Sequence, residues 1–406
     1  MTQNLSKELI LLTPLKARRG PKGGLILTQK YLDGAAAYAR YWPGPVTTLV
    51  KLDTRPDTNM DQVEIDPAKL ETGLEELPMD LAERARRLEA AALVVDFLSP
   101  YGLETAQLCK RIGVPVSYVS EYTPRTERQI IDAGTRNPLK RLRRRMWQMQ
   151  AERTRQQMLR NYAAGLQCSG TPTFDLYNAM APEPFLFFDN RVPAANILND
   201  ASLAAKCDQL ARGAPLRLMF GGRLIAMKGV LELPRIAQEL DRLAVPYRMD
   251  IVGQGDLEES LRQKIAAAGL SARVTLHPPM DFNSGWIPML KREADLFVCP
   301  HPQGDPSSTY PEVMSCGVPI VGYDNEAFAG IVRESGIGWS VPMFDARAMA
   351  RQIGALHADR AALQQAARAG RDFARQHCLE ETFSRRTAHL VKVSRLPNTL
   401  KTAASA

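Results

Sequence analysis

Short apolar runs alternate with helical patterns along this chain of 406 residues, and this alternation restricts its fold more than any other feature. In the first half, we predict buried strands at residues 8–12, 46–52, 92–97 and 114–119. The helical patterns between them cover residues 25–42, 81–91 and 101–112. Strands that alternate with helices in this way form parallel sheets covered on both faces. The sequence therefore predicts an α/β fold.

The alternation is interrupted at residues 189–215, which show no strong period and contain Pro193, Gly213 and Pro215. It restarts with a predicted strand at residues 216–220. A chain of this length suits two domains of roughly 150–200 residues each. We predict an N-terminal domain over residues 1–192, a C-terminal domain over 193–380, and a terminal helix and tail over 381–406 that packs back toward the N-terminal domain.

The net charge of +8 is concentrated in one segment, residues 136–160. That segment holds nine lysines and arginines and one acid, so the rest of the chain is neutral. Asn137 can cap a helix there, and Pro138 suits its first position. A stripe of apolar residues at helical spacing runs along the segment, formed by Leu139, Leu142, Met146 and Met149.

Two interpretations of this basic helix stay open: a solvated face, which most charge runs are, or a face that contacts an anionic membrane surface. We favour the membrane, with Lys140, Arg141, Arg143, Arg144 and Arg145 as the membrane-facing cations. A nucleic-acid partner is not predicted, because the remainder is neutral and carries no recognised nucleic-acid motif.

Membrane spans and metal sites are not predicted either. No stretch approaches the ~18 apolar residues of a membrane span, and the N-terminus does not read as a secretory signal. The six cysteines are scattered without a CxxC pair, which favours reduced thiols in the cytoplasm over disulfides or zinc. All five histidines lie at or after His277, so the first two-thirds of the chain offers no imidazole.

The strongest local motif follows the predicted strand at residues 216–220. Two glycines end that strand, and Arg223 and Lys228 follow, five residues apart, just before a helix. Glycines let backbone amides approach an anion, and two cations beside a helix start can hold a diphosphate. A plain strand-to-helix turn with solvated charges is the alternative.

Two further motifs follow strands in the second half. Gly253 and Gly255 form a GxG after a strand, but the third glycine and the ribose-binding acid of a dinucleotide site are missing. The pattern favours close approach of backbone rather than a nicotinamide cofactor. Glu312 lies in a turn that starts a helix, where it either complements the helix dipole or binds ribose hydroxyls.

Taken in order, these motifs resemble the nucleotide-sugar half of retaining glycosyltransferases of the GT-B type, family 4, the glycosyl transferases group 1. The resemblance covers residues 215–345 well and the N-terminal half more loosely. The matching stretches are Gly222-Arg223-Leu224, Lys228-Gly229, Val252-Gly253-Gln254-Gly255, Ala294-Asp295-Leu296-Phe297-Val298-Cys299-Pro300 and Glu312-Val313-Met314-Ser315-Cys316-Gly317-Val318-Pro319. In the N-terminal half, the matches are the glycine loop Lys22-Gly23-Gly24, the strand-end Ser169, and Asp189-Asn190-Arg191-Val192 in place of an N-G-V turn.

The resemblance implies two Rossmann-like domains with parallel sheets facing a cleft, the donor in the C-terminal domain and the acceptor in the N-terminal one. It implies that Arg223 and Lys228 clamp the donor diphosphate without a metal or other cofactor, and that Glu312 binds the ribose. Gly222, Gly253 and Gly255 would lie against the donor, Gly23 and Gly24 would approach its phosphate or sugar, and residues near His277 would flank its base.

Two departures from the family pattern concern the candidate catalytic residues. The family's first acid lies eight residues before its partner, where this chain has Gly304, and the nearest acid is Asp305. A histidine commonly ends the strand that faces the sugar, where this chain has Glu121.

We predict a cytoplasmic enzyme, peripheral on the inner face of the membrane. Its reaction would be that of a retaining hexosyltransferase, moving sugar from a nucleotide-diphosphate donor to a saccharide or lipid-linked acceptor in polysaccharide or glycolipid assembly. The alternative is a non-catalytic anion- or nucleotide-binding interaction protein on the same fold.

Overall fold

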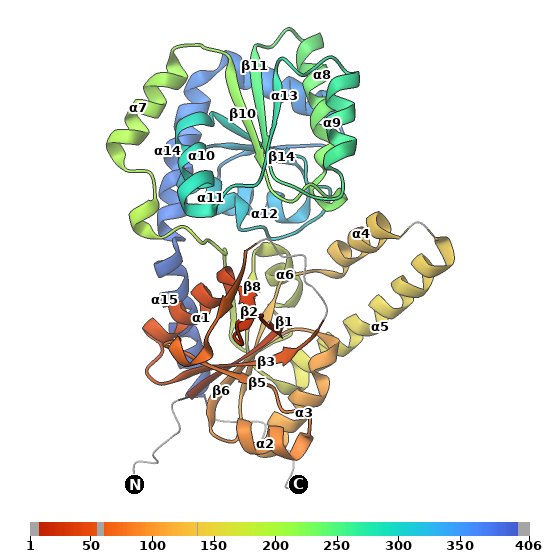
Figure 1. Cartoon of the computed structure of the whole chain (residues 1–406), viewed down its shortest axis with the longest axis vertical. Coiled ribbons are helices and arrows are strands. Elements are labelled where there is room, and N and C mark those ends of the chain that lie inside the picture. The colour runs from red at the N-terminus through yellow and green to blue at the C-terminus, as the bar shows by residue number, and fades with distance from the viewer. Residues whose placement is uncertain (1–7, 55–60, 136, 397–406) are drawn as a thin grey trace.

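The computed structural model describes residues 8–54, 61–135 and 137–396, which form two α/β domains stacked along the long axis of the molecule (Figure 1). The N-terminal sheet has the strands β1 (Glu8–Arg19), β2 (Leu25–Thr28), β3 (Val46–Leu52), β4 (Gln62–Ile65), β5 (Gly73–Glu76), β6 (Ala91–Phe97), β7 (Val116–Ser120), β8 (Ala163–Ser169) and β9 (Pro184–Phe187). The helices of this domain are α1 (Gln29–Tyr41), α2 (Leu81–Leu88), α3 (Leu103–Ile112), α4 (Pro124–Gly134), α5 (Pro138–Tyr162) and α6 (Thr171–Tyr177).

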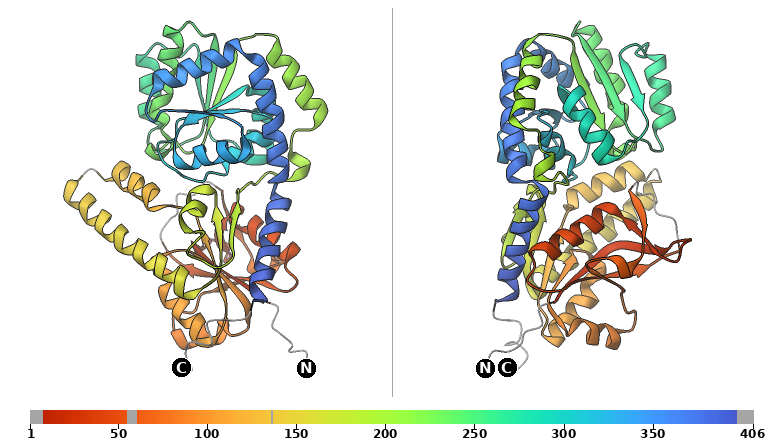
Figure 2. Two further views of the ribbon diagram at one scale, coloured as in Figure 1. Left: turned by 180° about the vertical axis from the view of Figure 1, so that it is seen from behind. Right: turned by 60° about the vertical axis from the view of Figure 1, so that its left-hand side comes forward.

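The second sheet is parallel throughout, in the order β12-β11-β10-β13-β14-β15. Its strands are β10 (Leu216–Gly221), β11 (Tyr247–Val252), β12 (Val274–His277), β13 (Leu296–Cys299), β14 (Ile320–Tyr323) and β15 (Trp339–Val341). Its helices are α7 (Asp200–Ala211), α8 (Leu233–Arg242), α9 (Glu258–Ala267), α10 (Ile287–Glu293), α11 (Thr309–Ser315), α12 (Glu326–Ser335), α13 (Ala346–Ala358) and α14 (Arg360–Gln376). Helices cover both faces of this sheet, so the predicted α/β fold class with two Rossmann-like domains is confirmed (Figure 2).

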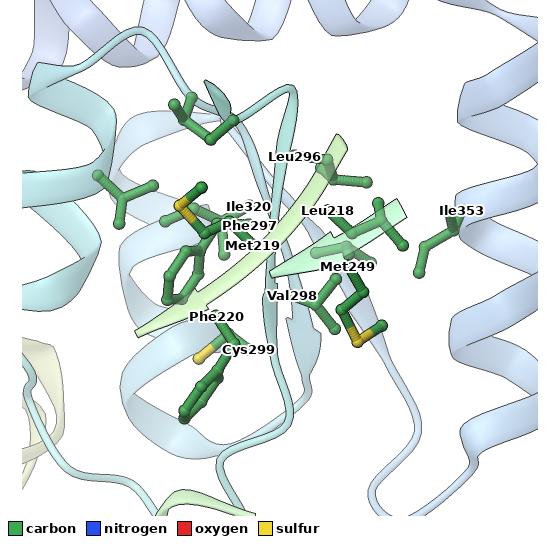
Figure 3. Packing of buried hydrophobic residues seen from close by; sticks show 14 of the residues in the cluster. Leu218, Met219, Phe220, Met249, Leu296, Phe297, Val298, Cys299, Ile320 and Ile353 are labelled. Atoms are coloured by element: carbon green, nitrogen blue, oxygen red, sulfur yellow. The ribbon is translucent and has the colours of Figure 1, made fainter. Parts of the chain in front are cut away.

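The core of the second domain explains why its strands read as continuous apolar runs. Leu218, Met219 and Phe220 of β10 are fully buried, and the Phe220 ring stacks on Phe297 of β13 at 6.1 Å between centroids (Figure 3). Ile353 of α13 closes the opposite face of the sheet. Because both faces of the sheet are buried, its strands lack the alternation of polar and apolar residues that marks a half-exposed strand. The change from apolar to polar residues in the sequence therefore marks where each strand ends and its loop begins.

The edge of the first sheet departs from the prediction. The helix expected over residues 25–42 begins only at Gln29, because residues 25–28 form β2, which pairs antiparallel with both β1 and β4. The predicted strand at residues 8–12 likewise continues to Arg19 after a register shift between Leu12 and Lys16. These two changes turn the predicted glycine loop into the tip of a β-ribbon.

The last helix, α15 (Leu379–Ser394), leaves the second domain and packs on α1, β8 and β9 of the first (Figure 2). The two domains are therefore joined twice, by the segment after β9 and by the segment before α15. Within the described residues, no helix combines the length and apolar character needed to cross a bilayer.

Candidate active site

The ends of β10 and β11 bring the two glycine motifs together. Gly222 donates its amide hydrogen to the carbonyl of Val252, and Leu224 donates to Gln254. Gly253 has φ +151°, and a Cβ there would lie 1.9 Å from the carbonyl oxygen of Gly222. The GxG glycine is thus required by the close approach of the two strand-end loops that lie beside Arg223.

Lys228 is the buried cation of this wall. Its side chain follows the Gly222 turn, is 11% exposed, and places its nitrogen 2.8 Å from a carboxylate oxygen of Asp305. Asp305 lies in the loop after β13, the strand beside β10. Arg223, in contrast, is exposed. The fold therefore joins the predicted phosphate-binding lysine and the predicted catalytic acid directly.

Glu312 is a second buried charge of the second domain. It lies in α11, is 4% exposed, and accepts a hydrogen bond of 2.9 Å from Nε of Arg191. His277 ends β12 on the far side of the same sheet, where its Nε2 lies 2.6 Å from a carboxylate oxygen of Asp250. Both predicted nucleotide-binding residues are thus held by a neighbouring charged side chain.

A cavity of about 470 Å³ opens in the first domain at the carboxyl ends of its parallel strands. Its wall is mostly apolar, and its polar members include Lys30, Glu121, Asp189 and Arg386. Open parallel sheets bind ligands at this edge, and a cavity of this size accommodates a sugar-sized ligand.

Glu121 follows β7 and faces this cavity. Burial among the cavity walls raises the pKa of its carboxyl to about 6, while the Lys30 cation acts in the opposite direction. The charges of Asp189 and Asp305 also act on Glu121, so this residue lies near Asp305 of the second domain as well as in the cavity wall.

Lys30, Arg191 and Arg386 belong to the site but were not predicted from the sequence. Lys30 of α1 forms a 2.6 Å ion pair with Asp189. Arg386, from α15, lies 3.9 Å from the ring centre of Phe187 and donates through Nε to Gln167. Neither Lys30 nor Arg386 lies in a motif. Arg191 offered one signal, since it stands where the family pattern has a glycine.

Gly23 and Gly24 lie in a different environment from the one predicted. Both belong to the exposed β1–β2 turn, where Gly23 donates to the carbonyl of Gly20 and Gly24 donates to the carboxylate of Glu64. Their amides are engaged within the ribbon, so this geometry gives no support to their predicted approach to phosphate. The N-terminal segment that does line the cavity is residues 11–15 of β1, at the register shift of that strand.

Helix α4 of the first domain contacts the loop after β13 in the second domain, the loop that carries Gly304 and Asp305. Its Thr126 hydroxyl donates to the carboxylate of Glu326 of α12 at 2.6 Å and lies 3.2 Å from the carbonyl oxygen of Gly304. Gln129 accepts a hydrogen bond from the Gly304 amide. The loop that carries Asp305 is therefore held from the opposite domain.

Helix α5 projects from the first domain with α4 packed along it (Figure 1). Its apolar stripe is not buried, and the exposed residues are Leu139, Leu142, Met146, Trp147 and Met149, each between 49% and 77% exposed. Two of the predicted membrane-facing cations are engaged with α4, because Arg144 donates to Thr135 and Arg145 pairs with Asp132. Lys140 and Arg143 remain exposed.

Two Rossmann-like α/β domains, joined both after β9 and before α15, have the architecture of the GT-B class of fold. The sequence model of the family described as Glycosyl transferases group 1 matches residues 207–373. The fold as a whole is similar to that of the Anabaena protein HepE, solved in complex with UDP, with a TM-score of 0.64 and 15% identity over 95% of this chain and 99% of that one. It is also similar to sucrose-phosphate synthase from Thermosynechococcus elongatus, with a TM-score of 0.58 and 17% identity over 95% and 98%.

Curated relatives match over shorter stretches. The putative colanic acid biosynthesis glycosyltransferase WcaL of Escherichia coli K12 is 28% identical over 151 residues, 36% of this chain and 37% of the relative. The amylovoran biosynthesis glycosyltransferase AmsK of Erwinia amylovora is 30% identical over 148 residues, 34% of each. The alpha-D-kanosaminyltransferase of Streptomyces kanamyceticus is 28% identical over 177 residues, 40% and 45%. These matches span less than half of each relative, and they support the predicted class, a glycosyltransferase enzyme.

Proposed function

We propose that this protein is a retaining glycosyltransferase of family 4 that transfers a hexose from a nucleoside-diphosphate donor to a saccharide or lipid-linked acceptor in polysaccharide or glycolipid assembly. The observation that supports the proposal is that Glu121 lines a sugar-sized cavity and also interacts electrostatically with Asp305, the partner of Lys228 in the second domain. An acceptor in the cavity would meet a donor on the opposite wall.

The chain's own cations supply the charge for the chemical step. Arg223 and Lys228 stabilise the diphosphate as the bond between the anomeric carbon and the phosphate oxygen breaks. The acceptor hydroxyl attacks from the same face, its oxygen bonds to the anomeric carbon, and its proton passes to the departing phosphate oxygen. Such a step requires no strong protein base, and Glu121 then orients the acceptor.

The second candidate is a non-catalytic nucleotide-binding protein on the same fold. Gly304 at the position of the family's first acid favours this candidate, because a glycine presents no carboxylate to the donor sugar. The two candidates differ in turnover and share nucleotide binding.

A thermal-shift panel of UDP-, GDP- and ADP-sugars tests binding first, since a ligand of the native state raises its melting temperature. UDP-sugars lead the panel because UDP is bound in the similar HepE structure.

Turnover is tested next: sugar transfer to an acceptor, or hydrolysis of the donor that binds, supports the proposed enzyme. In that assay Arg223→Ala and Lys228→Ala should each lower turnover at least about 100-fold, whereas Arg235→Ala, on an exposed ion pair of α8, should not. Binding without turnover would favour the second candidate.

We further propose that α5 docks on the anionic inner face of a membrane, which makes the protein peripheral and cytoplasmic. The exposed stripe from Leu139 to Met149 offers apolar surface, and each nearby cation contributes ~1 kcal/mol at such a surface. Co-sedimentation with phosphatidylglycerol vesicles should fall sharply in the Leu142→Gln/Met146→Gln variant and in Arg143→Gln. Arg160→Gln, exposed at the other end of α5, is the control. Equal binding of all variants, or equal binding to phosphatidylcholine, would contradict docking.

A further inference from the structure

Arg191 lies in the turn that joins the two domains and contacts the second domain through α11. The preceding residue, Asn190, is fully buried and donates to the hydroxyl of Ser315, the last residue of α11. Arg191 itself donates to Glu312, one turn earlier on the same helix. The turn is therefore fixed against the helix that carries the candidate ribose carboxylate.

The guanidinium of Arg191 is held on two further sides. Its central carbon lies 3.9 Å from the ring centre of Phe282, in the loop after β12, and one Nη lies 3.9 Å from Asp61. A planar guanidinium stacked on an aromatic ring loses rotational freedom. Arg191 thus presents its Nε–H to Glu312 in one orientation.

Glu312 keeps hydrogen-bonding capacity beyond this contact. An ionised carboxylate offers about four acceptor positions, and Arg191 Nε occupies one of them, on Oε1. At 4% exposure the residue has lost most of its contact with water, and a nearby opposite charge compensates for the burial of its carboxylate. Arg191 provides that charge and leaves Oε2 to accept hydroxyl hydrogens.

A second ion pair continues this arrangement into the first domain. Lys30 pairs with Asp189, two residues before Arg191, at 2.6 Å. Charge interactions couple Asp189 to Arg191 and Lys30 to Glu312. The signs of the charges alternate along Lys30, Asp189, Arg191 and Glu312, from the wall of the cavity to α11 of the second domain.

We propose that Arg191 is a positioning residue for the donor nucleotide: it orients the Glu312 carboxylate toward the ribose hydroxyls and ties that orientation to the contact between the two domains. The inference rests on the proposed function, because it takes the ligand of Glu312 to be a nucleoside diphosphate.

The test compares each ribonucleotide with its 2′-deoxy form. Binding of UDP, GDP and ADP to the wild-type protein is measured by calorimetry, and the nucleotide that binds is then compared with its 2′-deoxy counterpart. A charged acceptor facing the 2′-hydroxyl should make the ribonucleotide bind about 10-fold to 100-fold tighter. We expect Arg191→Gln to reduce this ratio at least threefold, and Arg191→Lys to retain part of it.

A matched control separates ribose recognition from domain contact. Arg333 of α12 and Asp175 of α6 form another interdomain ion pair, at 2.9 Å, with both side chains 55% exposed. Arg333→Gln removes a contact between the domains without touching Glu312, so the ratio should stay at its wild-type value.

A double-mutant comparison asks whether Arg191 acts through Glu312. Glu312→Gln should reduce the ratio, and adding Arg191→Gln to it should change the ratio no further. The proposal would be overturned if folded Arg191→Gln kept the wild-type ratio of ribonucleotide to 2′-deoxyribonucleotide affinity. It would also be overturned if Arg191→Gln reduced that ratio equally in the wild-type and Glu312→Gln backgrounds. Neither result would contradict nucleotide binding itself. A wild-type protein that binds no nucleoside diphosphate would instead overturn the proposed function.

Discussion

The ammonium nitrogen of Lys228 lies 2.8 Å from a carboxylate oxygen of Asp305, so the cation assigned to the donor diphosphate is paired within the protein itself. Both side chains are largely buried, at 11% and 17% exposure. Such a pair is electrostatically stronger than one on the surface. A diphosphate must share or displace this partner in order to contact Lys228.

This competition predicts that Asp305→Asn increases affinity for UDP, or for whichever nucleoside diphosphate binds, by about threefold or more. The gain should shrink at high salt, because a freed cation is screened more readily. Calorimetry at two ionic strengths measures both effects, with Lys228→Ala as the variant that loses binding. If Asp305→Asn instead weakens binding as much as Lys228→Ala, then Asp305 holds the lysine in place and does not compete for it.

The carboxyl of Glu121 should produce a pH dependence near neutrality. Its pKa is raised to about 6 because burial disfavours the ionised form. If transfer requires the carboxylate, kcat/KM will fall about tenfold per pH unit below pH 6 and level off above it. A profile from pH 5 to 8 checks this expectation, and Glu121→Gln should be low and flat across the range. An unchanged inflection near pH 6 in Glu121→Gln would assign it to another group.

Asp96, near the end of β6, should make the protein less stable as pH rises, which is the opposite of the effect of an ion-paired carboxylate. Burial raises its pKa to about 7, and its main local hydrogen bond comes from the Phe97 amide. A carboxyl whose folded-state pKa is raised favours folding while it is protonated, so stability falls as pH rises from about 4 to about 7.

The Asp96→Asn variant should therefore gain about 4 kcal/mol relative to wild type at pH 8 and little at pH 4. Urea unfolding at the two pH values measures the difference, with Asp208→Asn on the exposed face of α7 as the control. A difference between wild type and Asp96→Asn that is independent of pH would show that the substitution acts through packing alone.

The predictable parts of the molecule are those whose signal is local. Strands buried on both faces can be recognised in the sequence as continuous apolar runs, and β3 and β6 therefore lie where the sequence predicts them. The ribbon of β2 was missed because residues 25–28 find their partners in β1 and β4, and 33 residues separate the end of β2 from the start of β4. Cross-strand pairing at that separation leaves no local pattern.

The same distinction applies to the site. Lys228, Asp305 and Glu312 follow strands of one sheet, so strand-end motifs were enough to find them. Lys30 and Arg386 acquire a role only when α1 and α15, more than 300 residues apart in sequence, pack around one cavity. Side chains of that kind are recognised from geometry, because their spacing in the sequence carries no information about the cavity.

Gly229 provides a test of how tightly the turn after Lys228 packs against the loop after β13. It has φ +62°, and a Cβ there would lie 1.9 Å from the carbonyl oxygen of Pro300 in the loop after β13. Gly336, which ends α12, has a similar φ of +67° but open space where a Cβ would lie. Both glycines adopt a backbone conformation that costs an L-residue about 1 kcal/mol.

Gly336→Ala should therefore lose only about 1 kcal/mol of stability, whereas Gly229→Ala should lose about 3 kcal/mol or more, because the Pro300 loop must also move. Since that movement displaces Lys228, nucleotide binding should weaken in Gly229→Ala and stay unchanged in Gly336→Ala. Urea unfolding and calorimetry on the two variants separate the backbone conformation from the close approach. Equal losses of stability in the two variants would show that the Pro300 loop moves to accommodate the Cβ with no further loss of folding free energy.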